Sequence, residues 1–165
     1  MADWEAAFGE LLTARGSALR SYAYLLTGDA AAASDLVQDA LLRVFSRLRV
    51  GGDVVELEGY VRRVMLNQYV DGRRRATLWR QARHLLVHPP VHEDVDVTIA
   101  DEVRQALSTL SPKQRACIVL RYYEDRTVLE IAEQLSCAEG TVKRHLADAR
   151  AKLAAQLGAT EESLR

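Results

Sequence analysis

The sequence predicts an all-α protein built from two small helical domains that a flexible linker joins. Aromatic residues make up 6% of the 165 residues and proline occurs three times, which favours helices over a β-sandwich or barrel. Apolar residues recur at helical spacing on both sides of the middle of the chain. Between them lies the stretch HPPVHEDVDVT, which has two consecutive prolines and no helical stripe. We therefore expect domains over residues 1–80 and 101–165, with the linker over residues 81–100.

Charge and cysteine content narrow the functional classes. The net charge is −1, so the molecule as a whole is not a basic nucleic-acid binder, and any contact with DNA must rest on local patches. No run of about 20 apolar residues is present, so we expect no membrane span. The N-terminus, MADWEAAFGE, has no signal-peptide pattern, and two cysteines do not make a disulfide framework. We therefore expect a cytoplasmic protein with reduced thiols.

Three helices are predicted in the N-terminal domain. The first begins with Asp3 as a cap and ends at the chain-breaking Thr27-Gly28-Asp29. The second runs roughly over residues 29–48 and has a wide apolar face. The third runs from Glu56 to about Arg75. We expect the inward side of the third helix to hold Leu57, Tyr60, Val61, Val64 and Met65.

Polar residues gather on one side of each of the last two helices. Asp35, Gln38 and Asp39 share one side of the second helix, which by itself is also typical of a solvated acidic face. Residues 62–83 contain seven arginines and one acid, a net +6 that suits phosphate attraction. One side of the third helix holds Arg63, Asn67, Asp71 and Arg74. Tyr60, Tyr69 and Trp79 could stack on unpaired bases, although Tyr60 fits the core better.

The C-terminal domain is predicted to begin with a helix over residues 101–110. Ser111, Pro112 and Gln114 then give a strong helix start, with a Ser cap, Pro in the first turn and Gln three residues after the cap. This helix runs to about Tyr123. We expect Ile118, Val119 and Tyr122 on its inward side, and Cys117 as a core thiol.

Residues 127–157 predict two helices joined by a tight turn. Thr127 and Glu130 have the T-x-x-E spacing of a capping box, and Ser136 and Cys137 form the turn. The longer second helix has an apolar stripe of Val142, Leu146, Ala149, Leu153 and Leu157, and a donor-rich front of Thr141, Lys143, Arg144 and His145. A short helix, a turn and a helix with a basic front follow the helix-turn-helix plan, whose second helix fits the major groove of DNA. By itself the stretch is also typical of an amphipathic helical hairpin with a solvated basic face.

Four strings of this sequence resemble parts of the bacterial sigma factors, especially the small extracytoplasmic-function class. EGTVKRHLADARAKL, with SPKQRACIVLRYYEDRTVLEIAEQL before it, resembles sigma region 4. LLTGDAAAASDLVQDALLRVFSRL and YVRRVMLNQYVDGRRR resemble sigma region 2. The resemblance covers about residues 11–75 and 103–157, and the order of its parts resembles the short actinobacterial type.

The resemblance implies a factor that binds core RNA polymerase and promoter DNA. Asp35, Gln38 and Asp39 correspond to the surface that docks on the coiled coil of the polymerase β′ subunit. Asn67 corresponds to the place where the non-template strand of the −10 element is opened, and Arg63, Asp71, Arg73 and Arg74 surround it. The −35 element would be contacted by Thr141, Lys143, Arg144 and His145. An anti-sigma factor is a further partner that the resemblance leaves open.

The chain departs from the family pattern around its recognition helix. Ser136 stands where the turn usually has Gly, and Ala138 stands where the helix usually begins with Ser or Thr. The helix therefore lacks a side-chain cap, which costs about 1 kcal/mol. Asp148 stands where the family often has Arg. A carboxylate there would repel phosphate or select a cytosine amino group.

Two other functions stay open. A two-domain helix-turn-helix regulator acting without polymerase would need no docking surface on the second helix. A degenerate sigma factor that titrates an anti-sigma partner would be a pure interaction module. His84, His88 and His92 have a spacing that could chelate a metal on a helix, but Pro89 and Pro90 interrupt that helix. No catalytic motif is present, so we expect neither an enzyme nor a bound cofactor or metal.

Overall fold

The computed structural model describes residues 3–47, 53–83 and 101–158, with side chains for all of these except Asp3 and residues 73–83. Every regular element in these ranges is a helix, which confirms the all-α prediction. The chain divides into two compact units, Met1–Val97 and Thr98–Arg165. None of the described helices is long and apolar enough to cross a membrane.

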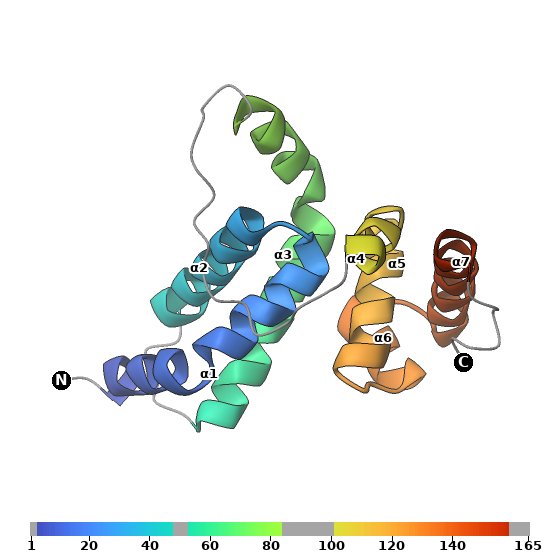
Figure 1. The fold of residues 1–165 in the computed structure, drawn as a ribbon. Helices are drawn as coiled ribbons and strands as arrows, with labels where there is room; N and C mark the ends of the chain where they lie inside the picture. Colours follow the sequence, from blue (N-terminus) through green and yellow to red (C-terminus); the bar gives the residue numbers. More distant parts are fainter. Residues whose placement is uncertain (1–2, 48–52, 84–100, 159–165) are drawn as a thin grey trace. The chain divides into compact units, whose positions relative to one another are not determined.

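The described part of unit 1 contains three helices, α1 (Asp3–Thr27), α2 (Ala30–Arg47) and α3 (Val54–Arg83), each of which packs against the other two (Figure 1). The predicted break between α1 and α2 is confirmed. Gly28 has φ 70°, a left-handed conformation that costs glycine nothing, and Asp29 Oδ1 accepts a hydrogen bond from the Ala31 amide at 3.2 Å.

The core of unit 1 is made by the apolar faces of the three helices. Phe8 and Phe45 meet edge to face, with ring centroids 4.7 Å apart, and so join the start of α1 to the end of α2. The largest fully buried side chains are Leu11, Leu19, Tyr22, Leu26, Val44, Val61, Met65 and Leu66. Burying these side chains removes a large apolar area from water, which is the main force that holds the three helices together.

Two expectations for α3 are wrong. The helix continues to Arg83 rather than ending near Arg75, because residues 76–83 contain neither glycine nor proline and nothing there stops a helix. Tyr60 was expected inside but is 46% exposed. The inward side of α3 is centred on Leu57, Val61 and Met65, and Tyr60 lies beyond its edge.

Unit 2 contains α4 (Asp101–Ser108), α5 (Pro112–Ile118), the π-helical turn η1 (Val119–Tyr123), α6 (Val128–Leu135) and α7 (Glu139–Leu157). The long helix α7 packs against α4, α5 and α6. The predicted start of α5 is confirmed, because Ser111 Oγ accepts from the Gln114 amide at 3.2 Å and Gln114 Oε1 accepts from the Ser111 amide at 3.1 Å. The core consists mainly of Leu107, Leu110, Ala116, Cys117, Ile118, Leu120, Ile131, Val142, Leu146 and Leu153.

The expectation that Tyr122 lies inside is also wrong, since it is 50% exposed. In a continuous α-helix Tyr122 would lie over Ile118, one turn away. The chain instead widens into η1, where the Glu124 amide bonds to the Val119 carbonyl at 3.2 Å, five residues back. One extra residue in the turn shifts Tyr122 off the buried side, and the periodicity of apolar residues gives no sign of such a turn.

Candidate nucleic-acid and partner-binding surfaces

The predicted capping box at the start of α6 is present. Thr127 Oγ1 accepts from the Glu130 amide at 3.2 Å, and Glu130 Oε2 accepts from the Thr127 amide at 2.8 Å. The helix ends at Ser136, which has φ 53° and ψ 47°, and the Cys137 amide bonds to the Ala132 carbonyl at 3.0 Å. This left-handed residue turns the chain sharply, so that α7 begins two residues after the turn and packs on α6.

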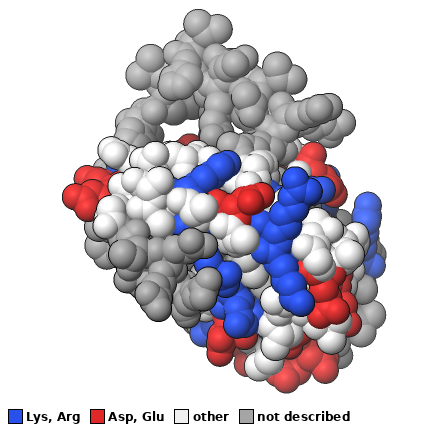
Figure 2. Space-filling view, turned by 90° about the vertical axis from the view of Figure 1, so that its right-hand side faces the viewer, with Lys and Arg blue, Asp and Glu red and all other residues white. Residues whose placement is uncertain are grey.

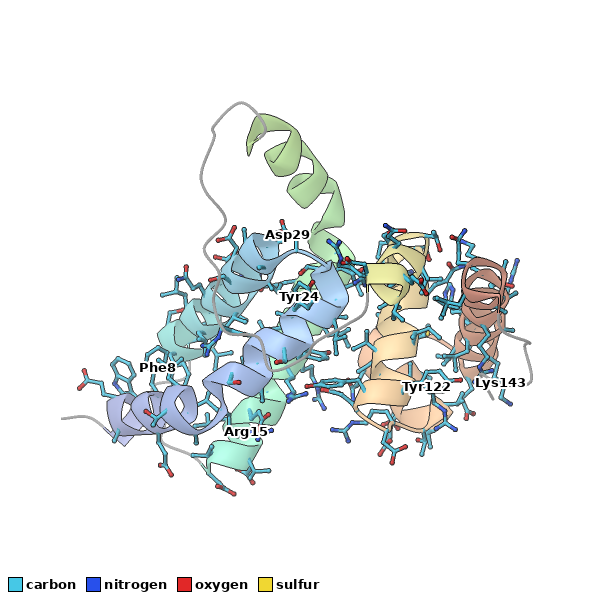
Figure 3. All side chains as sticks on the ribbon, viewed as in Figure 1. Phe8, Arg15, Tyr24, Asp29, Tyr122 and Lys143 are labelled. Carbon is cyan, nitrogen blue, oxygen red and sulfur yellow. The ribbon has the colours of Figure 1, made fainter. Side chains whose placement is uncertain are left out.

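The buried and exposed sides of α7 follow the predicted division. Its buried side consists of Val142, Leu146, Ala149 and Leu153, whereas Leu157, the last residue of the predicted stripe, is only half-buried. Thr141, Lys143 and Arg144 are exposed, and His145 is half-buried. Lys143 is labelled in Figure 3. Among the residues that the structure describes, no hydrogen bond or ion pair engages the side chains of Lys143 and Arg144. Both cations are therefore available to a ligand.

Two other cations on α7, Arg150 and Lys152, form hydrogen bonds within the protein instead. Arg150 Nε donates to the Tyr122 hydroxyl at 2.8 Å, and the Arg150 guanidinium lies 5.8 Å from the centroid of the Tyr122 ring. Lys152 Nζ donates to Gln114 Oε1 at 3.0 Å. These contacts tie α7 to η1 and α5 (Tyr122 is labelled in Figure 3). The sequence did not predict them, because both depend on the tertiary packing of α7.

The first turn of α7 has no side-chain cap, as predicted. Ala138 has φ −75° and ψ 151°, the backbone geometry of a capping residue, but no side chain accepts from the first-turn amides. The Ala138 carbonyl accepts from the Thr141 and Val142 amides at 3.0 and 3.2 Å. The positive end of the helix dipole, together with its first amides, is thus open to an anion such as a DNA phosphate.

Charged side chains near the start of α7 affect the pKa of His145. Partial burial lowers the pKa of His145, and Lys113 and Arg144 lower it further, while Asp148 acts in the opposite direction. His145 is therefore mainly neutral at pH 7, so it can both donate and accept hydrogen bonds.

On the face shown in Figure 2, Lys and Arg side chains stand beside Asp and Glu side chains rather than forming one uniformly basic surface.

A candidate docking face on α2 brings together the predicted acidic and amide groups. Asp35, Gln38 and Asp39 are all exposed on the side of α2 away from the core. Leu42 and Arg43 share that side, and Leu42 is 69% exposed. We call these five residues the docking face. An exposed leucine within a rim of charges is typical of the centre of a protein contact.

A second stripe runs along α3. Tyr60, Arg63, Asn67 and Asp71 are exposed and recur at spacings of three and four residues, so they share one side of the helix. We call these four residues the α3 stripe. Tyr60, which was expected in the core, thereby joins the polar residues. Arg73 and Arg74 continue on α3, but their side chains lie outside the described part, as does that of Trp79.

One of the seven arginines in residues 62–83 is engaged in a contact within the protein. The Arg62 guanidinium donates to Glu58 Oε1 at 2.9 Å and lies 5.1 Å from the centroid of the Tyr22 ring. Arg62 therefore belongs to the packing between α1 and α3.

The thiols and histidines give no second site in the part of the chain that the structure describes. Cys117 is fully buried, and this burial, with a smaller effect of Cys137, raises the pKa of its thiol to about 12, as expected for a core thiol. No group of three or more His, Cys, Asp or Glu side chains within the described ranges could hold a metal ion. The histidines His84, His88 and His92 lie outside those ranges.

Comparisons with known proteins agree on one family. Residues 11–94 match the model of sigma-70 region 2, and residues 100–153 match that of sigma-70 region 4. An RNA polymerase sigma-E factor of Streptomyces coelicolor is 34% identical over 160 residues, which cover 96% of this chain and 90% of the relative. The ECF RNA polymerase sigma factor SigL of Mycobacterium tuberculosis is 35% identical over 135 residues, which cover 76% of this chain and 74% of the relative.

A solved structure shares the fold. The sigma factor RpoE, crystallised in complex with the anti-sigma factor NepR from Bartonella quintana, is similar with a TM-score of 0.63 and 24% identity. The similarity covers 96% of this chain and 98% of that chain.

Proposed function

This chain belongs to the sigma-70 family, within its extracytoplasmic-function sigma factors, and we propose that its two units divide promoter recognition between them. Sigma factors bind core RNA polymerase and promoter DNA, and this chain is a polymerase-binding initiation factor. Its similarity to Streptomyces and Mycobacterium factors supports the actinobacterial type. RNA synthesis belongs to the polymerase, so we assign this chain no catalytic group and place its action in the cytoplasm.

The two family matches, one in each half of the chain, support this division of labour. We assign core docking and the −10 element to a domain over residues 1–80, and the −35 element to a domain over residues 101–165, with residues 81–100 as the linker. The observation that carries the upstream assignment is α7 itself. Its back is buried, and Lys143 and Arg144 on its front form no hydrogen bond or ion pair with another described side chain. Such a helix can enter the major groove without giving up an internal contact.

Core docking is assigned to the docking face on α2. A basic coiled coil such as that of the β′ subunit would pair with the carboxylates of Asp35 and Asp39, and Gln38 can both donate and accept. The exposed side chain of Leu42 supports a contact with protein rather than with solvent alone, because burying it on docking would remove apolar surface from water.

The −10 element is assigned to the α3 stripe and the arginines that follow it. Asn67 carries a donor and an acceptor on one short side chain, which suits the exposed edge of an unpaired base. Arg63 lies one turn before it, and Arg73 and Arg74 follow on the same helix, where their charge favours phosphates. Tyr60, with nearly half of its surface exposed, is a further candidate for stacking on a base.

The sequence-based alternatives predict different results from one pair of measurements. The full chain, carrying an affinity tag, is incubated with core RNA polymerase, and the recovered complex transcribes a library of genomic fragments, with core polymerase alone as the control. We expect co-elution with core polymerase and transcripts that start downstream of a common sequence. DNA binding without co-elution would identify a regulator that acts without polymerase. Co-elution without specific transcripts would identify an interaction module, whose partner would then be sought among anti-sigma factors like the one bound to the Bartonella homologue.

A further inference from the structure

One acidic side chain lies on the DNA-facing side of α7. Asp148 is exposed and follows Arg144 by four residues, so it lies on the same side of the helix, about 6 Å further along the axis. The buried residues Val142, Leu146 and Ala149 lie on the opposite side. If α7 enters the major groove as proposed above, Asp148 enters with it.

Nothing within the described part of the chain neutralises this carboxylate. No cation lies within ion-pairing distance of Asp148 among the described residues. Asp148 does interact electrostatically with His145, three residues earlier on the same helix. His145 is mainly neutral at pH 7, however, so it does not balance the charge of Asp148. The carboxylate therefore faces outward with its accepting oxygens unused.

The neighbours of Asp148 allow the helix backbone to approach the bases closely. Gly140, Ala147 and Ala151 are exposed on the same outward side, and a Cβ atom placed on Gly140 would meet no atom within 4 Å. An aspartate side chain is short, so it reaches a base edge only where the backbone comes near. Small neighbours permit that approach, and Lys143, toward the flank of the helix, supplies the attraction to phosphate that a carboxylate lacks.

The chemistry of the groove then decides which base the carboxylate tolerates. A carboxylate offers only acceptors. Guanine presents N7 and O6 acceptors and thymine presents O4, so both repel it, while adenine places its N7 acceptor beside its amino donor. Cytosine presents an amino donor alone. We infer that Asp148 is a specificity-determining residue that selects cytosine at one position of the −35 element, an inference that rests on the proposed role of α7.

The test is a selection from promoter DNA with a randomised upstream segment, using the full chain bound to core RNA polymerase. The wild-type chain should enrich cytosine at one upstream position. Asp148→Ala should flatten that preference by about 5- to 150-fold and leave other positions unchanged. Asp148→Asn, which keeps the shape of the side chain, should shift the preference from cytosine to adenine, because an amide pairs with adenine N6 and N7.

Two controls separate the possible failures. Glu102→Gln removes one negative charge from exposed α4, so it reports the effect of net charge alone. If both Asp148 variants change the affinity for every sequence by one common factor, or if the wild type enriches no cytosine, the inference is wrong. Arg144→Ala tests the reading helix itself. If that variant selects the same sequences as the wild type, the proposed role of α7 fails; if it alters the selection while the cytosine preference survives both Asp148 variants, only the role of Asp148 fails.

Discussion

The Arg15 guanidinium donates two hydrogen bonds to the Glu58 carboxylate, at 2.7 and 2.9 Å, although the two residues lie 43 positions apart. Arg62, one turn after Glu58 on α3, donates to the same carboxylate at 3.1 and 2.9 Å. Glu58 thereby joins α1 to α3. The side chain of Glu58 is only 12% exposed, so this contact is better shielded from solvent than an ordinary surface ion pair.

The first prediction is that Glu58→Gln lowers the free energy of unfolding by about 1–2 kcal/mol at pH 7. Burial by itself would raise the pKa of Glu58, but Arg15 and Arg62 outweigh it and hold the pKa below its ordinary value. Because the folded pKa is the lower one, the contribution of the carboxylate is complete above about pH 4.3, the ordinary Glu pKa, and is lost as the pH falls through the folded pKa.

Urea unfolding of the two proteins at pH 7 and at successively lower pH measures this difference. The gap between wild type and Glu58→Gln should narrow below about pH 4. Glu10→Gln, a change at an exposed position of α1, serves as the control and should alter stability by no more than about 0.5 kcal/mol. A gap that stays constant down to acidic pH would mean that the charge of Glu58 contributes nothing.

The local start and stop signals of the helices could be predicted from sequence. The Ser111 and Thr127 caps, the Gly28 break and the turn at Ser136 each depend on residues close together in the chain, so the sequence contains all that determines them. The π-helical turn at Val119–Tyr123 could not be predicted, because the periodicity of apolar residues gives no sign of it. That turn exposed Tyr122 and created its contact with Arg150.

The sequence could predict which residues share one face of a helix, but not which of their side chains are already bound within the protein. Asp35, Gln38 and Asp39 do share one exposed side of α2, as the period of 3.6 requires. Arg62, however, was counted with the basic segment, and the structure shows it bound to Glu58. The sequence pattern of a charged helical residue is the same whether its side chain binds another helix or DNA. Only the tertiary contacts distinguish these two roles.

The second prediction concerns the docking face. Asp35→Arg combined with Asp39→Arg should abolish binding to core RNA polymerase, because two attractive charges become repulsive toward a basic coiled coil. Both positions are exposed, so thermal unfolding should change little. Affinity for core polymerase, measured by co-elution or by fluorescence anisotropy, provides the test.

The matched control for the docking face is Glu5→Arg with Glu10→Arg, which makes the same change in net charge at two exposed positions of α1. This control should retain core binding. If the Asp35 and Asp39 variant binds core polymerase as tightly as the control does, α2 is not the docking element.

The third prediction separates the two free cations of α7. Arg144 lies opposite the buried side of the helix, whereas Lys143 lies toward its flank. Arg144→Ala should therefore cost about 1–3 kcal/mol of binding free energy and relax specificity at one base. Lys143→Ala should instead weaken binding to all sequences alike and reduce the slope of log affinity against log salt concentration by about one. Binding of the holoenzyme to variants of the −35 element at several salt concentrations distinguishes these patterns. If neither variant loses affinity for any sequence, α7 is not the reader.

The last prediction concerns strand opening by the α3 stripe. Asn67 is exposed on the same side of α3 as Arg63 and Tyr60, so it can meet an unpaired base while its neighbours hold phosphate and stack. Asn67→Ala should leave core binding and the closed complex intact but reduce the open complex, because the side chain that captures a flipped base is missing. Permanganate reactivity of unpaired thymines across the −10 element measures opening. A template melted in advance over the same positions should partly restore transcription by Asn67→Ala, since the duplex no longer has to be opened. Wild-type permanganate reactivity of the variant on duplex DNA would instead locate strand capture elsewhere, and Tyr60→Ala would then be the next variant to measure.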